Sequence, residues 1–182
     1  MRITGGSAKG KIIKTPKNGD IIRPALAQVR EAVFSSLGDV SEQRFMDVFA
    51  GTGSLGFEAL SRGADFVYFV DDHPQAVALI LENLKSLGFE KQAHLFKRRL
   101  PHGLSTIKIS GRVDVVFCDP PYDKNLLNPT LARLAEQNYI DPKTLLIIEH
   151  TRREVPENTA FDLIKQKKFG QTLISYLKRH GN

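Results

Sequence analysis

The sequence predicts an α/β fold with a seven-stranded, mostly parallel sheet that ends in an antiparallel hairpin. Short apolar runs alternate with longer segments of helical periodicity, as expected for parallel strands joined by crossover helices. The first run of this series leads directly into a glycine-rich turn, residues 51–56, that opens a helix. The last two runs are separated only by residues 169–171, so they are predicted to pair antiparallel.

The first 40 residues are predicted to form an extension to the main domain, which covers residues 41–182. Residues 2–4 and 9–15, separated by Gly5-Gly6-Ser7-Ala8, indicate a short β-hairpin arm with basic outward positions and little core of its own. Apolar residues at helical spacing over 25–37 predict a helix that packs against the main domain and ends at Gly38.

In the main domain, local signals place each element. Pro74 at the first helical position and Gly88 after the last one bound the clearest helix. Helices are predicted from the glycine turn to about residue 62 and at 74–87, 104–107 and 126–136. Strands are predicted at 44–50, 66–70, 93–97, 113–118, 144–150, 161–168 and 172–178.

Composition narrows the class of protein. Cys118 is the only cysteine and lies in an apolar run, which indicates a reducing compartment and no thiolate metal site. The five histidines show no ligand spacing, so no metal is expected. The sequence has no signal-like start and no apolar run of about 18 residues, so we expect a soluble, cytoplasmic protein without a membrane partner.

The net charge of +6 is distributed unevenly. Residues 1–19 and 91–113 each carry several Lys and Arg and no acid, and residues 165–179 add a third basic group. Any one of these segments is usually a solvated face, but three together favour a polyanionic partner. The arm is predicted to clamp RNA, and the candidate RNA-binding residues are Arg2, Lys9, Lys11, Arg23 and Arg30.

The glycine turn suits a ligand that approaches the backbone closely, and two cofactor classes compete for it. Asp47 precedes the turn; it can engage the ammonium of S-adenosylmethionine but would repel the pyrophosphate of a dinucleotide. Acids about 20 residues after such a turn bind a ribose diol in nucleoside-binding folds. The candidate cofactor contacts in this half of the chain are Asp47, Phe49, Ala50, Gly51, Thr52, Gly53, Asp71 and Asp72.

The clearest chemistry follows the fourth strand. The apolar run 113–118 stops at Asp119-Pro120-Pro121-Tyr122, which places a rigid turn at the edge where open α/β sheets bind ligands. Asp119 and the Pro120 carbonyl can accept the two N–H bonds of an exocyclic amine while Tyr122 stacks on the base. We therefore take these four residues as catalytic candidates, against the alternative of a simple loop with a rim aromatic.

Several stretches also match the pattern of a known family. They are Arg2-Ile3 with Lys9-Gly10-Lys11, Arg23-Pro24, and residues 29–34, 47–56, 58–64 and 119–122. On these stretches the chain resembles, over nearly its whole length, the RsmD family of bacterial 16S ribosomal RNA guanine-N2 methyltransferases.

The resemblance implies a class I, Rossmann-like methyltransferase fold with S-adenosylmethionine as the methyl donor. The acceptor would be the exocyclic N2 amine of a guanine in 16S ribosomal RNA, within the small ribosomal subunit or an assembly intermediate. We further expect the protein to act as a monomer. Candidate catalytic residues would then be Asp119, Pro120, Pro121 and Tyr122.

The sequence departs from the family pattern in three places. Ile22 stands where the family usually has Thr, and Ala27-Gln28 stands where it has an acid. After the third strand, Lys97-Arg98-Arg99-Leu100 replaces an acid that would bind the adenine amine of the donor. Backbone groups of Arg99 and Leu100 are expected to serve there instead.

Two other functions compete with this interpretation. A DNA adenine-N6 methyltransferase uses the same Asp-Pro-Pro-Tyr, but the chain has no sizeable target-recognition domain with which to read a duplex. A non-catalytic RNA-binding assembly factor could keep the fold, and Arg99 favours it, whereas the intact Asp119 and Tyr122 oppose it.

Overall fold

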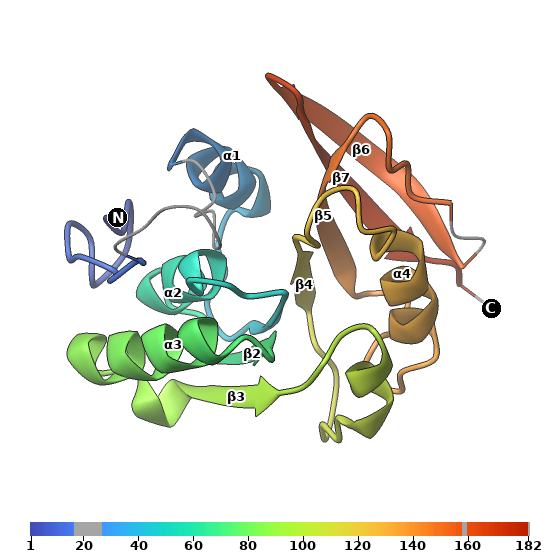
Figure 1. Ribbon diagram of the computed structural model, residues 1–182. Coiled ribbons are helices and arrows are strands. Elements are labelled where there is room, and N and C mark those ends of the chain that lie inside the picture. The colour runs from blue at the N-terminus through green and yellow to red at the C-terminus, as the bar shows by residue number, and fades with distance from the viewer. Residues whose placement is uncertain (17–26, 158–159, 182) are drawn as a thin grey trace. The chain divides into compact units, whose positions relative to one another are not determined.

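The strands and helices follow the order that the apolar pattern predicts (Figure 1). The computed structural model describes residues 1–16, 27–157 and 160–181, and it divides into two units, residues 1–97 and 98–182. All seven predicted strands are present, with boundaries within two residues of those expected. The predicted helix at 104–107 is instead a 3-10 helix that begins earlier, η2 (His102–Thr106).

The first unit is built on three parallel strands. Their order is β3-β2-β1, with Met46 beside Tyr68 and Phe69 beside Leu95. Helices α2 and α3 pack against these strands, α2 on β1 and β2 and α3 on β3 (Figure 1). The elements described in this unit are α1 (Ala27–Leu37), β1 (Arg44–Val48), α2 (Ser54–Ser61), β2 (Phe66–Asp71), α3 (Pro74–Leu87), η1 (Glu90–Gln92) and β3 (Ala93–Lys97).

Helix α2 is enclosed along its whole length, with all eight of its residues buried. Gly56 allows this close packing, because a Cβ at that position would lie 2.2 Å from Cε1 of Phe69 on β2. The rings of Phe57 and Phe69 meet with centroids 5.1 Å apart. The last glycine of the turn is therefore needed for helix-to-strand packing, as in nucleotide-binding α/β folds.

The second unit contains the end of the sheet that mixes strand directions. Its strand order is β4-β5-β7-β6, in which β4 and β5 are parallel and β7 runs antiparallel to both of its neighbours. All four residues of β4 are buried, so the apolar run stops at the sheet edge as predicted. The elements described are η2, β4 (Val115–Cys118), α4 (Leu127–Ala135), β5 (Leu145–Thr151), β6 (Phe161–Phe169) and β7 (Thr172–Arg179).

The N-terminal arm is more firmly packed than its composition suggested. Its hairpin consists of a single antiparallel bridge between Arg2 and Ile12. Ile3, Ala8 and Ile13 nevertheless have at most 2% of their surface exposed, so the arm takes part in the buried core, and the expectation of a clamp that is not part of the core is wrong.

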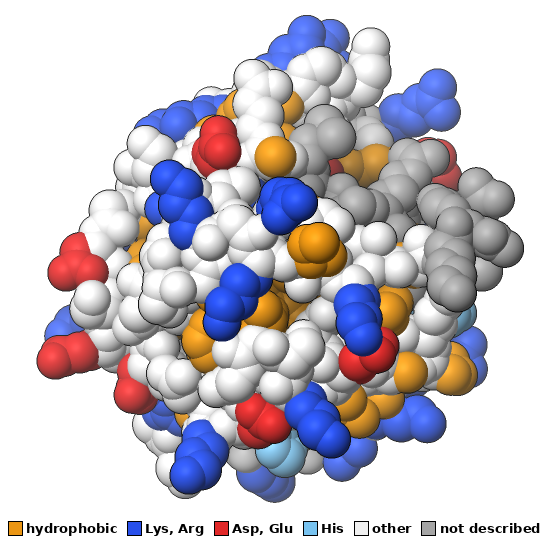
Figure 2. All heavy atoms as spheres, turned by 90° about the vertical axis from the view of Figure 1, so that its left-hand side faces the viewer, with side chains coloured by type: hydrophobic (Ala, Val, Ile, Leu, Met, Phe, Trp, Pro, Cys, Tyr) orange, Lys and Arg blue, Asp and Glu red, His pale blue; other side chains and the backbone are white. Residues whose placement is uncertain are grey.

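The outward side of the arm is basic. Lys9 and Lys11 are exposed, and Figure 2 shows Lys and Arg side chains spread over this face with apolar side chains between them. No helix in the described ranges is long and apolar enough to cross a membrane.

Candidate active site

Backbone geometry explains the glycines in the turn between β1 and α2. Gly51 and Gly53 have φ angles of 55° and 74°, which favour glycine. The Gly53 N–H donates to the Ala50 carbonyl at 2.7 Å, and the Gly53 carbonyl accepts from the Phe57 N–H at 2.8 Å, so the turn runs directly into the helix. Phe49 has a φ of 61°, an uncommon value for a bulky residue that is often found at binding loops.

Asp71, at the end of β2, holds this turn from the neighbouring strand. Its Oδ2 accepts the Gly51 N–H at 2.9 Å and its Oδ1 accepts the His73 N–H at 2.9 Å. Each carboxylate oxygen can accept a second hydrogen bond, so the group can also accept from a ribose hydroxyl. Asp72 is exposed beside it. The ribose contact expected of these two acids stays a prediction.

Asp47 is a buried carboxyl group, with 4% of its surface exposed. Its Oδ2 accepts the Gly56 N–H at 3.0 Å, in the first turn of α2. Burial raises the pKa of Asp47 to about 8; the Gly56 hydrogen bond acts against the rise and the charge of Asp71 adds to it. A cation placed beside this group would favour the ionised carboxylate.

The chemistry of this turn suits a cationic ligand. Residues 47–56 contain no Lys or Arg, and the carboxyl groups of Asp47 and Asp71 flank the turn. A pyrophosphate would find no positive side chain among these residues, whereas an ammonium or sulfonium group would be attracted to them. The residues present therefore fit S-adenosylmethionine.

The other predicted cofactor contacts are Ala50 and Thr52 in the glycine turn and Arg99 and Leu100 after β3. Ala50 and Thr52 are buried in the turn. Arg99 and Leu100 belong to the second unit, where Arg99 is exposed and Leu100 is half-buried. The Arg99 carbonyl accepts the Gly103 N–H at 2.7 Å, so one backbone acceptor of this stretch is already engaged within its own unit.

The motif predicted to bind an amine follows β4 directly. Asp119 and Tyr122 are half-buried, Pro120 is buried and Pro121 is exposed. Burial raises the pKa of Tyr122, and the negative charge of Asp119 is among the further causes. The charge of Asp119 is therefore felt at the Tyr122 hydroxyl.

Sequence reasoning missed Glu149, which contacts this motif. The Tyr122 hydroxyl donates to Glu149 Oε1 at 2.9 Å and lies 3.5 Å from Thr172 Oγ1. A partial signal was present: Glu149 follows four apolar residues near the carboxyl end of its strand, the edge where open sheets bind ligands, but the sequence does not show that this strand end lies beside Tyr122.

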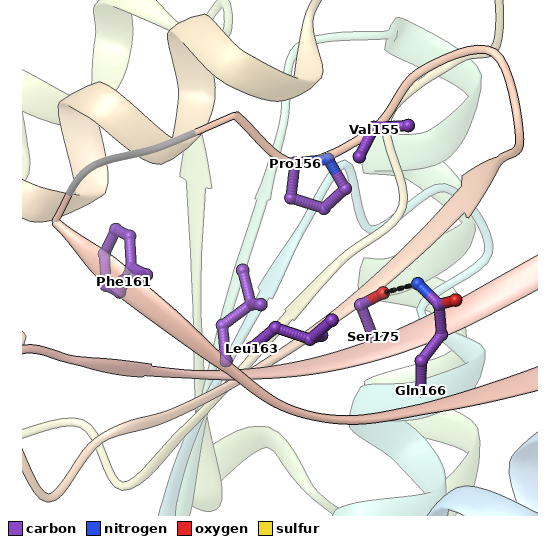
Figure 3. Close-up of a pocket in the computed structure, with 7 residues that line it drawn as sticks. Val155, Pro156, Phe161, Leu163, Gln166 and Ser175 are labelled. Atoms are coloured by element: carbon purple, nitrogen blue, oxygen red, sulfur yellow. Dashed lines mark hydrogen bonds between the residues drawn. The ribbon is translucent and has the colours of Figure 1, made fainter.

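A separate hollow lies on the hairpin of the second unit (Figure 3). It is lined by Val155, Leu163 and Gln166 among others, and none of the predicted site residues takes part. Its polar side is satisfied, because Gln166 Nε2 donates to Ser175 Oγ at 2.9 Å and that oxygen lies 2.7 Å from Nε2 of the buried His150. We read this hollow as part of the packing of the hairpin.

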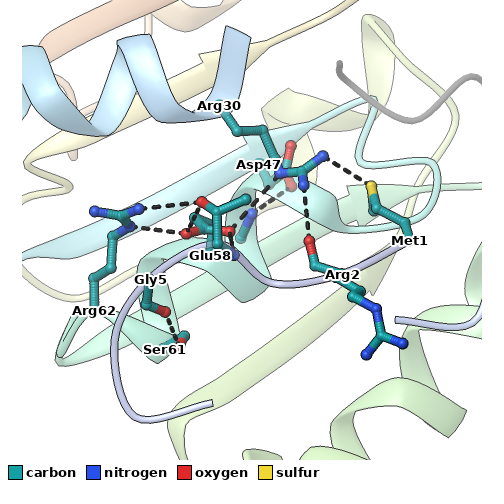
Figure 4. Close-up of polar contacts among 10 residues, drawn as sticks. Met1, Arg2, Gly5, Arg30, Asp47, Glu58, Ser61 and Arg62 are labelled. Atoms are coloured by element: carbon teal, nitrogen blue, oxygen red, sulfur yellow. Dashed lines mark hydrogen bonds and ion pairs between the residues drawn. The ribbon is translucent and has the colours of Figure 1, made fainter. Parts of the chain in front are cut away.

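Among the RNA-binding candidates, Arg2, Lys9 and Lys11 are exposed, while Arg23 lies outside the described residues. Arg30 requires a correction, because its side chain is only 1% exposed. It shares the buried face of α1, where its guanidinium donates to the Arg2 carbonyl at 2.9 Å (Figure 4). A phosphate cannot reach a guanidinium enclosed in this way.

Glu58 of α2 is the acid that Arg30 meets, at 3.8 Å (Figure 4). Its Oε1 accepts from Thr4 Oγ1 at 2.7 Å and from Arg62 Nε at 2.9 Å, and its Oε2 accepts the Thr4 N–H at 3.0 Å. Burial lowers the pKa of Arg30, and the charge of Glu58 opposes that effect. Arg30 therefore helps to hold the arm on the first unit.

Parallel strands with a glycine turn after the first, an acid before that turn and an Asp-Pro-Pro-Tyr after the fourth strand define a class I methyltransferase. The chain belongs to the family described as conserved hypothetical protein 95, the RsmD family, whose model matches residues 1–178. The resemblance noted in the sequence is thereby confirmed.

Individual relatives agree with this assignment. Ribosomal RNA small subunit methyltransferase D of Haemophilus influenzae is 33% identical and covers 97% of this chain and 91% of its own length. The protein of the same name from Escherichia coli K12 is 27% identical and covers 98% and 90%. The solved structure of the Escherichia coli protein yhhF superposes with a TM-score of 0.84 at 26% identity and covers 100% of this chain and 99% of its own.

Proposed function

We propose that this protein methylates the exocyclic N2 amine of a guanine in small-subunit ribosomal RNA, with S-adenosylmethionine as the donor. The observation that carries the proposal is the Asp119-to-Tyr122 motif, which follows the buried strand β4 directly. The names of the relatives support ribosomal RNA as the substrate. We propose that the protein works as a cytoplasmic monomer on the small subunit or on an assembly intermediate.

Residues of the first unit would hold the donor. Asp47 would pair with the donor ammonium, Asp71 and Asp72 would bind the ribose hydroxyls, and the backbone from Phe49 to Gly53 would pass close to the methionine part. Bound S-adenosylmethionine supplies an electrophilic methyl group on a sulfonium, which departs as a neutral thioether.

Residues of the second unit would hold the acceptor. Asp119 and the Pro120 carbonyl would each accept one N–H of the amine, which turns the nitrogen lone pair away from both of them. Tyr122 would stack on the base after it has left its helix. Catalysis then comes mainly from alignment of nitrogen, carbon and sulfur. In well-oriented intramolecular reactions such alignment lowers the activation barrier by up to roughly 7–11 kcal/mol.

The amine must also lose a proton. As the N–C bond forms and the C–S bond breaks, the nitrogen becomes positive and its N–H bonds become stronger donors. Asp119 stabilises this charge and accepts the proton, or passes it to water. Its interaction is therefore stronger in the transition state than with the bound base, which is the condition for raising turnover.

Nucleoside mass mapping tests the proposal. Ribosomal RNA from cells that lack the protein should lose one N2-methylguanosine, and the purified protein with S-adenosylmethionine should restore it. Appearance of N6-methyladenine in DNA instead would replace this function by the adenine alternative. Calorimetry with S-adenosylhomocysteine and NAD gives an independent check, since tight binding of NAD alone would exclude the donor assignment.

The Asp119→Ala variant separates the two halves of the site. Turnover should fall by at least about 100-fold, as expected for loss of a group that assists proton transfer, while affinity for S-adenosylhomocysteine stays the same. An equal loss of donor affinity would assign Asp119 to the cofactor instead.

A further inference from the structure

Glu149, at the carboxyl end of β5, touches the amine-binding motif but has no part in the chemistry proposed above. Its Oε1 accepts the Tyr122 hydroxyl proton at 2.9 Å, and Thr172 on β7 lies 3.5 Å from the same hydroxyl. The ring of Tyr122 is thus anchored at one end by its own backbone and at the other by side chains of two further strands.

The second oxygen of this carboxylate is unusual. Glu149 Oε2 is buried and has no hydrogen-bond partner among the described residues. Burial raises the pKa of Glu149, and the bond from Tyr122 opposes the rise. A buried acceptor without a partner costs folding free energy, so packing alone does not explain an acid here. A role exercised through Tyr122 does explain it.

The loop that follows the motif is held in the same manner. Asp123 and Asn125 have φ angles of 58° and 52°, in the left-handed region that is costly for most side chains. The Asn125 N–H donates to Glu154 Oε1 at 2.9 Å, and Glu154 Oε2 is likewise buried without a partner in the described ranges. Carboxylates from the end of β5 and the segment after it therefore hold the Tyr122 side chain and the backbone at Asn125.

We propose that Glu149 is a positioning residue that sets the plane of Tyr122, and hence of the guanine stacked on it. The inference rests on the function proposed above. Without the bond at its far end, the ring is free to turn about its side-chain torsions, and the amine of a stacked base turns with it. Even a small rotation of the base moves the reacting nitrogen out of line with the methyl carbon and sulfur, which lowers the rate of transfer. Donor affinity should not depend on Glu149, because the donor contacts of the glycine turn belong to the first unit.

Four variants test the proposal with 16S ribosomal RNA or small subunits from cells that lack the protein. Glu149→Leu removes the acceptor, Glu149→Gln keeps an oxygen acceptor, Tyr122→Phe keeps the ring without its hydroxyl, and Tyr122→Ala removes the ring. We expect Glu149→Leu and Tyr122→Phe each to lower kcat/KM for RNA by about tenfold, as for loss of one buried hydrogen bond, and Glu149→Gln to stay within roughly threefold of wild type. Affinity for S-adenosylhomocysteine should be unchanged in all four.

Two further readouts separate positioning from stability. Glu149→Leu should melt at the wild-type temperature or above it, because an unsatisfied buried oxygen is removed. The double variant Glu149→Leu/Tyr122→Phe should lose no more activity than either single variant, since the same hydrogen bond is absent from all three. Glu136→Gln serves as the neutral control, because Glu136 is exposed and forms only a surface ion pair with Arg133.

Each contrary outcome has a distinct meaning. Multiplied losses in the double variant, or a fall in melting temperature that matches the fall in activity, overturn the positioning role. If Tyr122→Ala abolishes methylation while Glu149→Leu and Tyr122→Phe are fully active, this inference fails and the proposed function stands. Full activity of Tyr122→Ala removes the stacking role of Tyr122 and this inference with it, whereas absence of methylation by the wild-type protein removes the proposed function itself.

Discussion

At the scale of the single residue, Asp47 combines two demands that conflict in the free protein. It is buried in β1, where desolvation disfavours its charge, and it faces a turn where a charged carboxylate would be useful. Its pKa of about 8 means that the protonated form dominates near neutral pH. Donor binding and ionisation of Asp47 should therefore be linked.

The stability of the free protein should reflect this raised pKa. The native state binds the Asp47 proton up to about pH 8, whereas the unfolded chain releases it near pH 4. The contribution to stability is thus complete below the unfolded pKa and is lost as pH rises through the folded pKa. We expect the free energy of unfolding from urea titrations to fall between pH 5 and pH 8, by at most roughly 1.4 kcal/mol per unit from this group.

The Asp47→Asn variant is the control for that titration. It should have a flatter stability curve over the same range, because the amide does not ionise. Saturating S-adenosylhomocysteine should reduce the slope of the wild type, since the bound ammonium favours the carboxylate. A slope that is the same in wild type and variant would assign the pH dependence to other groups.

At the scale of the element, helix α2 joins the arm to the glycine turn. Its first turn donates to Asp47, its last turn carries Glu58 and Ser61, and Arg62 follows it directly; these three residues bind the arm. Ser61 Oγ accepts the Ala8 N–H at 2.9 Å and donates to the Gly5 carbonyl at 2.5 Å. One short helix therefore carries both the cofactor-facing end and the docking surface of the arm.

Glu58→Gln should be strongly destabilising. The change keeps the shape of the side chain but removes the main counter-charge of the buried Arg30 guanidinium, and breaking a buried ion pair typically costs about 3–5 kcal/mol. The measurement is the urea midpoint of unfolding. Glu82→Gln is the matched control: its pair with Lys14 is 54% exposed on both sides, and its loss should cost less than about 1 kcal/mol. Similar midpoints for the two variants would show that the buried network contributes little.

The elements themselves were largely predictable. Helix α3 agrees with the prediction at both ends because Pro74 and Gly88 are strong local signals, and Gly88 does adopt a left-handed φ of 80°. Strands β1, β4 and β5 were found because buried parallel strands read as nearly continuous apolar runs. The packing of the arm was not predictable, since Glu58, Ser61 and Asn83, which hydrogen-bond to it, are far away in the sequence.

Prediction at the site failed for a related reason. Arg30 was assigned to RNA by its charge, but the position of a cation on α1 relative to Glu58 is settled only by tertiary packing. Glu149 escaped notice because nothing in the local sequence shows which strand end lies beside Tyr122. Charge and periodicity therefore locate single elements well, whereas contacts between elements decide what each charged residue does.

At the scale of the whole molecule, excess positive charge is the feature that should govern the encounter with RNA. The exposed Lys9 and Lys11 of the arm carry no acidic partner in sequence within residues 1–19. The arm is bonded to Glu58 and Ser61, so deleting it would disturb the fold as well as the charge. Point substitutions are the cleaner test of an RNA clamp.

The Lys9→Gln/Lys11→Gln variant should bind RNA less tightly and with a weaker salt dependence. For each RNA phosphate that these lysines neutralise, the substitution should reduce the slope of log affinity against log salt by roughly 0.7–0.9. Lys85→Gln/Lys143→Gln, two exposed lysines elsewhere, gives the same change in net charge. Equal slopes for the two double variants would show that the arm contributes only bulk charge.

The anchoring of the arm also bears on how the chain folds as it is synthesised. Thr4 cannot form its hydrogen bonds until Glu58 has been synthesised. Lys14 likewise depends on Asn83, whose side chain accepts the Lys14 N–H and donates to the Lys14 carbonyl. The arm is therefore synthesised well before the residues that hold it. Until α3 has been made, we expect this basic segment to stay undocked, so that folding of the first unit ends with the arm rather than beginning with it.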